Sequence, residues 1–151
     1  MTQDEFEDLL VDNTKTIEGD IDWSDDEDHS PAVEFQAAIS NAQNMPVELR
    51  GSYNQILEKL TFAVIHRGLG RIYSLDLGHD HRNPDTGVKV GDKHKHRWSE
   101  AYKAKVAYIP DDITEPANFP LLVWEQFCAE FRLTHNGQMR SLPPIQGIIG
   151  L

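Results

Sequence analysis

The chain has little cysteine, no long apolar run and few basic residues near its start. Its single cysteine, Cys128, excludes a disulfide within the chain, and this usage is typical of a reducing, intracellular setting. We therefore expect a cytoplasmic location. No run of about 18 apolar residues occurs, so we expect no membrane span. The acidic start lacks the charged and apolar regions of a secretion signal, and we expect none.

The shortage of basic residues is confined to residues 1–30. This segment holds twelve acidic residues and one basic residue, Lys15, and it accounts for the whole formal net charge of −11. We therefore predict an acidic N-terminal segment, 1–30, and a single domain, 31–151. The segment repels nucleic acid and membranes. Two interpretations remain open: a solvated, partly disordered tail, or a surface that contacts a basic protein, including one that mimics a phosphate backbone.

Hydrophobic periodicity predicts an α+β fold, with an antiparallel β-sheet, a C-terminal helix packed on one face and a short N-terminal helix. Alternation with period two predicts strands. The expected strands cover residues 32–39, 46–51, 60–66, 71–77 and 88–98. A short loop containing glycine joins 60–66 to 71–77, which predicts a hairpin. Residues 101–109 fit a helix or a strand equally well.

Two segments show helical spacing. Phe6, Leu9 and Leu10 lie on one stripe, which predicts a short helix within residues 5–11. Residues 119–133 form the clearest helix, with a proline suited to its first turn and a stop signal at Asn136-Gly137. Its expected buried stripe comprises Leu122, Phe127 and Phe131, broadened by Val123, Trp124 and Cys128.

Four of the seven histidines gather between residues 71 and 98 as two His-x-His pairs, His79/His81 and His94/His96. On an extended strand, residues i and i+2 point to the same face with Cα atoms about 6.5–7 Å apart. Two such imidazoles can reach one ion at the usual Zn–N distance of about 2.0–2.1 Å. Asp76, on the preceding strand, adds a carboxylate. We predict a metal site formed by all five residues, with zinc as the expected ion, although nickel, manganese and iron accept these ligands.

Other interpretations of these histidines stay open. The basic residues between them are compatible with polar surface histidines, or with a patch that binds phosphate or RNA. Nucleic acid is not the expected partner, because no aromatic stacking platform accompanies the basic residues. Cys128 is expected to be a buried, inert thiol, with a role as a fourth metal ligand as the alternative. His66 and His135 are solitary, and we expect them to be structural or surface residues.

Residues 71–110 resemble an uncharacterised group of small bacterial and phage proteins. The shared pattern is a Leu-Asp-Leu strand end, a His-Arg-Asn-Pro-Asp-x-Gly turn, a His-x-His segment with a nearby aromatic residue, and an Ala-Tyr step. In this chain the aromatic residue is Trp98, one place later than expected. The pattern is also similar to the toxin half of a toxin–antitoxin pair. The resemblance favours Asp76, His81, His94 and His96 over His79 as the important set.

Small size and an acidic flank also resemble anti-CRISPR proteins, by analogy rather than shared motifs. The resemblance implies a stoichiometric inhibitor that binds the basic surface of a Cas nuclease. Since no nucleophile elbow, phosphate-binding loop or dinucleotide fingerprint occurs, we favour a zinc-stabilised, non-enzymatic inhibitor or binding protein of phage type. The alternative is a metal-dependent nuclease or toxin that uses the same histidines, with His79 or Asp80 as a base.

Overall fold

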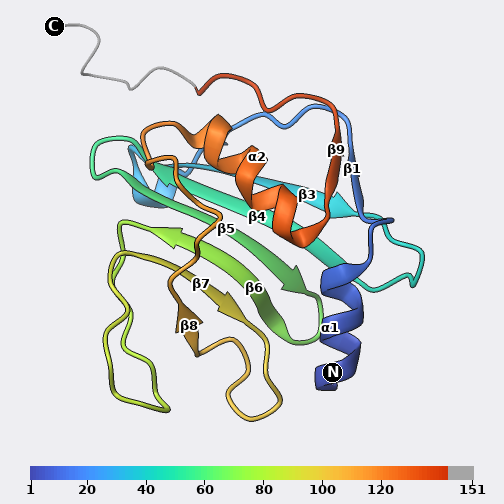
Figure 1. Cartoon of the computed structure of the whole chain (residues 1–151). Helices are drawn as coiled ribbons and strands as arrows, with labels where there is room; N and C mark the ends of the chain where they lie inside the picture. Colours follow the sequence, from blue (N-terminus) through green and yellow to red (C-terminus); the bar gives the residue numbers. More distant parts are fainter. Residues whose placement is uncertain (143–151) are drawn as a thin grey trace, which may run out of the picture.

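The computed structural model describes residues 1–142 and has the predicted α+β class. Seven strands form one antiparallel sheet in the order β2-β3-β4-β5-β6-β7-β8, so neighbours in the sequence are neighbours in the sheet (Figure 1). Their bounds are β2 Ser24–Asp25, β3 Val33–Ile39, β4 Val47–Asn54, β5 Lys59–His66, β6 Gly70–Leu77, β7 Lys93–Arg97 and β8 Ala107–Tyr108. The predicted hairpin is β5–β6.

Two α-helices and a small second sheet complete the fold. Helix α2 (Pro120–Phe131) lies across one face of the large sheet, as predicted, and α1 (Gln3–Val11) lies near one end of it (Figure 1). Strands β1 (Thr16–Glu18) and β9 (Thr134–Asn136) pair in parallel, and a short 3₁₀ helix, η1, covers Glu27–His29. Neither α-helix in this described part of the chain is long and apolar enough to cross a membrane.

The core lies between α2 and the sheet. Alternate residues of β5 point toward α2, and the ring of Phe62 lies 5.2 Å from Trp124 and 5.7 Å from Phe127, between ring centroids. Burial of each such side chain contributes about 1.5–3 kcal/mol. The intervening residues of the strands, among them Thr61 and Asp76, lie on the opposite face, which α2 leaves uncovered. The metal-site candidates occupy that second face.

The acidic segment, 1–30, is part of the fold and shares this core. Phe6 and Leu9 of α1 are fully buried, and β2 pairs with β3 at the edge of the large sheet. The predicted helix is confirmed, and Thr2 with Glu5 forms a capping box at its start. Most carboxylates of the segment remain exposed. The hydrophobic core therefore includes residues on both sides of residue 30, and only the charge changes there. The interpretation of residues 1–30 as a solvated tail is wrong.

Several local predictions need correction. Helix α2 ends at Phe131, before the expected stop at Asn136-Gly137, because Arg132 adopts a left-handed conformation (φ 52°) and β9 follows. Leu122 does not belong to the buried stripe, since it is 43% exposed. Only five residues of 88–98 form a strand, β7, and residues 101–109 contribute only β8. The other residues of these two segments form loops with their own backbone hydrogen bonds.

A buried ionic cluster ties α2 to the sheet. Oε1 of Glu130 accepts hydrogen bonds from the hydroxyls of Tyr73 (2.7 Å) and Tyr108 (2.8 Å). It also lies 3.1 Å from Nη2 of Arg97 and 3.4 Å from Nζ of Lys95. Burial opposes ionisation of Glu130, but the hydrogen bond from Tyr73 and the Lys95 charge outweigh it and lower the pKa to about 2. The ionised carboxylate therefore stabilises the fold.

Glu130→Gln should destabilise the protein by about 1–3 kcal/mol near neutral pH, because the buried Lys95 then keeps only Asp112 as an acidic partner and the half-buried Arg97 loses its carboxylate. The stabilisation from Glu130 is present above its ordinary pKa of 4.5 and is lost as the pH falls toward about 2. Denaturant unfolding measured across this pH range should show a smaller pH dependence in the variant. Glu125→Gln, at an exposed position of the same helix, should match the wild type. Equal stability of the two variants would contradict the role of Glu130.

Candidate metal centre

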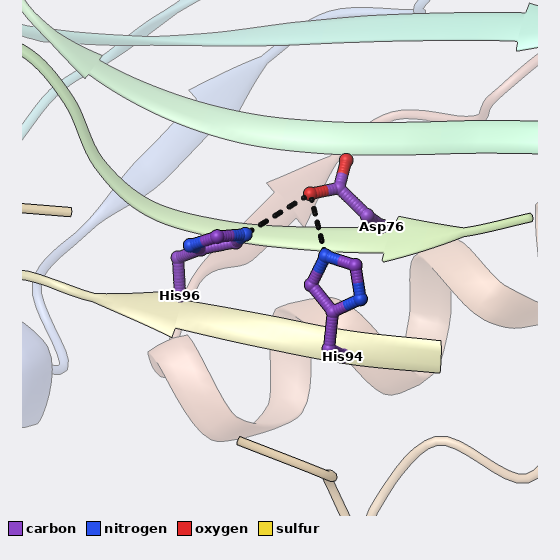
Figure 2. A group of neighbouring side chains, drawn as sticks. All are labelled: Asp76, His94 and His96. Atoms are coloured by element: carbon purple, nitrogen blue, oxygen red, sulfur yellow. Dashed lines mark ion pairs between the residues drawn. The ribbon is translucent and has the colours of Figure 1, made fainter. Parts of the chain in front are cut away.

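The pairing of β6 with β7 brings three candidate ligands together. Asp76 is directly opposite His94, and His96 is opposite Ser74, the next residue on the same face of β6. Because Lys95 and Arg97 point toward Glu130 on α2, alternation sends His94 and His96 to the opposite face of the sheet. There both imidazoles face the carboxylate of Asp76 (Figure 2).

The three side chains converge on one point. Nε2 of His94 lies 3.3 Å from Oδ2 of Asp76, and Nε2 of His96 lies 3.4 Å from the same oxygen. A charge-assisted hydrogen bond is shorter, about 2.7–2.9 Å. The edge of a tetrahedron with ligands about 2.0–2.1 Å from its centre is about 3.3–3.4 Å, which matches both separations. The ligand atoms all lie within 4.8 Å of one another and could hold a metal ion.

The surroundings of both rings fix which nitrogen is free. Nδ1 of His94 lies 2.9 Å from the carbonyl oxygen of Gly91, and Nδ1 of His96 lies 2.7 Å from that of Ala104. A carbonyl only accepts, so each Nδ1 must carry a proton and donate it. In the neutral ring Nε2 then presents its lone pair to the Asp76 side. Ligating histidines in metal centres have this arrangement, with the other nitrogen held by a carbonyl or carboxylate.

The site is buried and carries a negative charge. Asp76 and His96 are each 6% exposed, and His94 is 1% exposed. Burial opposes ionisation of Asp76, but its contacts with His94, His96 and Thr61 outweigh that effect and hold its pKa well below the usual range. Burial likewise opposes protonation of His94, yet the contact with Asp76 raises the pKa of His94 on balance. The electrostatics therefore favour a cation, proton or metal, between the rings and the carboxylate.

The other two predicted ligands lie differently. The half-buried ring of His81 has its centroid 4.6 Å from that of His96 and 5.6 Å from that of His94. Its Nε2 donates to the carbonyl oxygen of Lys105 (2.6 Å), which leaves Nδ1 unprotonated in the neutral ring. Within residues 1–142, the group of converging ligand atoms contains no atom of His81 and no atom of His79. His79 is exposed. His81 is thus adjacent to the site, whereas His79 points to solvent.

The loop that carries His81 is well anchored. The Asn83 side chain exchanges two hydrogen bonds of 2.8 Å with the backbone of Ala107 on β8. Oδ1 of Asp80 accepts from the backbone N–H groups of His81 and Gly91. The predicted turn closes through a hydrogen bond between Gly87 N–H and the carbonyl of Asn83. His81 is therefore held near the site before any metal arrives.

Cys128 plays no part in this centre. It lies on α2, across the sheet from the histidines, and only 8% of it is exposed. Burial raises the pKa of its thiol to about 12, so it stays protonated. Its expected role as an inert core residue therefore fits, and the alternative role as a fourth ligand does not.

Sequence reasoning missed the groups that orient the ligands. The Thr61 hydroxyl donates to Oδ1 of Asp76 (2.7 Å), and Nη1 of Arg71 lies 3.4 Å from Oδ2. The predicted β5–β6 hairpin contained the signal for Thr61, because its register places Thr61 opposite Asp76. The carbonyls of Gly91 and Ala104 belong to irregular loops, for which periodicity gives no signal.

The fold and site define an α+β protein with an open antiparallel meander and a buried cluster of two histidines and one aspartate. The chain belongs to the family of unknown function DUF6978, which matches residues 1–133. The match includes both the acidic segment and the cluster. We found no curated protein and no solved structure that matches the chain.

Thr61→Val should weaken metal binding about 10–100-fold, because the hydroxyl that orients Asp76 is lost while the shape is kept. Ser52→Ala is the matched control, since Ser52 lies beside Thr61 in the same cross-strand row but one strand further from Asp76. Zinc affinity measured by competition with a chromophoric chelator separates the two variants. Equal affinities would show that the Thr61 hydroxyl does not support the site.

Proposed function

We propose that this protein binds zinc through Asp76, His94 and His96, with His81 as the fourth ligand. The observation that carries the proposal is the convergence of two Nε2 atoms on one carboxylate oxygen at 3.3 and 3.4 Å. Imidazole and carboxylate donors in a tetrahedral arrangement suit zinc. A small turn of the His81 ring, at the cost of its hydrogen bond to Lys105, would bring a nitrogen to the ion.

The proposed role of the zinc is structural. His81 belongs to the loop between β6 and β7, whereas the other ligands belong to the strands themselves. A closed site with four protein ligands would clamp this loop onto the open face of the sheet and leave no position for substrate. Burial of Asp76, His94 and His96 supports a closed site. The exposed outside of the loop then remains available for contacts.

Substitution of His94 or His96 by alanine should reduce zinc affinity by at least about 100-fold. His79→Ala should retain wild-type affinity, because His79 lies outside the converging group. His81→Ala tests the fourth ligand and should give an intermediate loss. Elemental mass spectrometry of the purified proteins gives the zinc content, and chelator competition gives the affinity.

Thermal unfolding with and without zinc provides the second measurement. Zinc at about 1,000 times its dissociation constant should stabilise the wild type by about 4 kcal/mol, and the His94 and His96 variants far less. A wild-type protein that binds no zinc and is not stabilised by it would contradict the proposal.

For the role of the protein, we propose a non-enzymatic inhibitor of phage type, an anti-CRISPR that acts in the cytoplasm on a Cas nuclease. Most carboxylates of residues 1–30 are exposed, while the apolar side chains between them face the core. The acids are thus presented on a folded surface, which supports contact with a rigid basic partner. Phage origin and the Cas target rest on the resemblance of size and charge.

Reversal of charge on α1 tests this role. Replacing Asp4, Glu7 and Asp8 by lysine spares the capping residue Glu5 and should abolish inhibition of DNA cleavage by a sensitive Cas nuclease. The control replaces two exposed acids elsewhere, Asp85 and Asp111, by lysine and should keep full inhibition. Cleavage assays against a panel of purified Cas nucleases measure both. Absence of inhibition across the panel, or equal loss in both variants, would contradict the role.

A second candidate is a metal-dependent nuclease or toxin. One observation favours it: the converging group contains three ligands, the number that catalytic zinc sites supply while keeping a position open for water. His81→Ala separates the candidates. A structural site should lose stability with this change, whereas an open catalytic site should keep its zinc and its fold. Metal-dependent cleavage of nucleic acid by the wild type would decide for the enzyme.

A further inference from the structure

The open face of the sheet carries a trough beside the candidate metal centre. Its volume is about 230 Å³, and it extends over β3, β4, β5 and β6. Ser52 and Thr61 line it from one cross-strand row, and Arg50 and Ala63 line it from the next. On β6 these two rows continue to Asp76 and Ser74, beyond the trough. The trough therefore reaches the metal centre through Thr61, which lines it and also donates to Asp76.

Two arginines border this trough on the central strands of the sheet. Between them lies Ala63 of β5, which is only 3% exposed because longer side chains of the neighbouring strands close over its methyl group. Arg50 and Arg71 both line the trough. They belong to strands two places apart, about 9–10 Å, and both side chains border the same hollow. Planar guanidinium groups on two sides are suited to the oxygens of a phosphate group.

Arg71 is held loosely by its neighbours. Its Nη1 lies 3.4 Å from both Oδ2 of Asp76 and Oγ of Ser74, at the outer limit of hydrogen bonding, and its side chain is 41% exposed. Arg50 lies 3.3 Å from Glu48 on the surface, and Glu34 lines the far part of the trough. Without a metal ion, the Asp76 carboxylate offsets the charge of Arg71, so this end of the trough becomes positive when a cation occupies the metal centre.

We infer that this trough binds a phosphate group between Arg71 and Arg50, and that a metal ion at Asp76 strengthens the binding. The second part rests on the proposed metal site. A divalent ion would take Oδ2 of Asp76, the oxygen that Arg71 now approaches, and would repel the guanidinium toward the trough. The freed guanidinium and the added positive charge then both favour the anion. Coupling of this kind is reciprocal and is commonly about 5–150-fold in affinity.

The size of the trough indicates what carries the phosphate. Pockets for drug-sized ligands usually measure about 300–1,000 Å³. A trough of about 230 Å³ therefore accommodates a phosphate group and little else. The group belongs either to free phosphate or to a phosphomonoester whose remainder lies outside. Both share the same recognition chemistry, and two probes distinguish them.

The test titrates inorganic phosphate and phenyl phosphate into the full-length protein, zinc-free and with one equivalent of zinc. Heteronuclear NMR follows the Nε–H signals of the arginines, and calorimetry gives affinities. The wild type should bind at least one probe, with signals of Arg50 and Arg71 shifting, and zinc should raise the affinity about 5–150-fold. Preference for phenyl phosphate would assign the site to a phosphomonoester, and equal binding to the phosphate group alone.

Variants complete the design. Arg71→Ala should weaken phosphate binding about tenfold or more and should remove its dependence on zinc. The control Arg67→Ala removes an exposed arginine of the β5–β6 turn, outside the trough, and should bind as the wild type does. Circular dichroism confirms that each variant is folded. Wild-type binding by Arg71→Ala, or no binding of either probe at millimolar concentration, would overturn the inference.

The zinc content of every sample is measured separately. If the wild type takes up no zinc, the proposed metal site fails, while the zinc-free titration still decides whether the trough binds phosphate. If zinc binds and phosphate affinity is unchanged by it, the coupling through Arg71 is wrong even though the metal site stands.

Discussion

The antiparallel register of β6 against β7 is the constraint on which the rest of the molecule depends. It places Asp76 opposite His94 and Ser74 opposite His96, and so gathers the candidate ligands at one point. Because side chains alternate along a strand, a slip of one residue would exchange the two faces of β7. The histidines would then lie under α2, and Lys95 would lie against Asp76. The metal site and the attachment of α2 would be lost together.

Strand β7 is unusual in being both highly charged and buried on each face. Its sequence, Lys-His-Lys-His-Arg, would suit an exposed strand, yet Lys95 is fully buried. Its Nζ lies 2.6 Å from Asp112, and the neighbouring Glu130 serves Lys95 and Arg97 together. Buried charge is tolerated only when it is paired, and here each face has its own partner. These two sets of pairs oppose any other register.

Local sequence patterns predicted the fold well where a single rule dominates. The predicted strands 32–39, 60–66 and 71–77 were found from their apolar residues and alternation, and both helices were found from apolar stripes at helical spacing. Strands β1 and β9 were missed because each has three residues and pairs with a segment over a hundred residues away. For a related reason, the sequence left open whether the acidic segment is a solvated tail or a folded surface. Its charge dominates its composition, while six buried apolar side chains attach it to the core.

The same distinction applies to the site. Spacing alone identified His94, His96 and Asp76, because a strand places alternate residues on one face whatever its neighbours are. It could not separate His81 from His79, since both lie in the loop after β6, where side chains do not alternate between two faces. What separates them is the loop: Asn83 pairs with Ala107 on β8 and Asp80 binds the backbone at Gly91. These contacts direct His81 toward the other two rings and leave His79 in solvent.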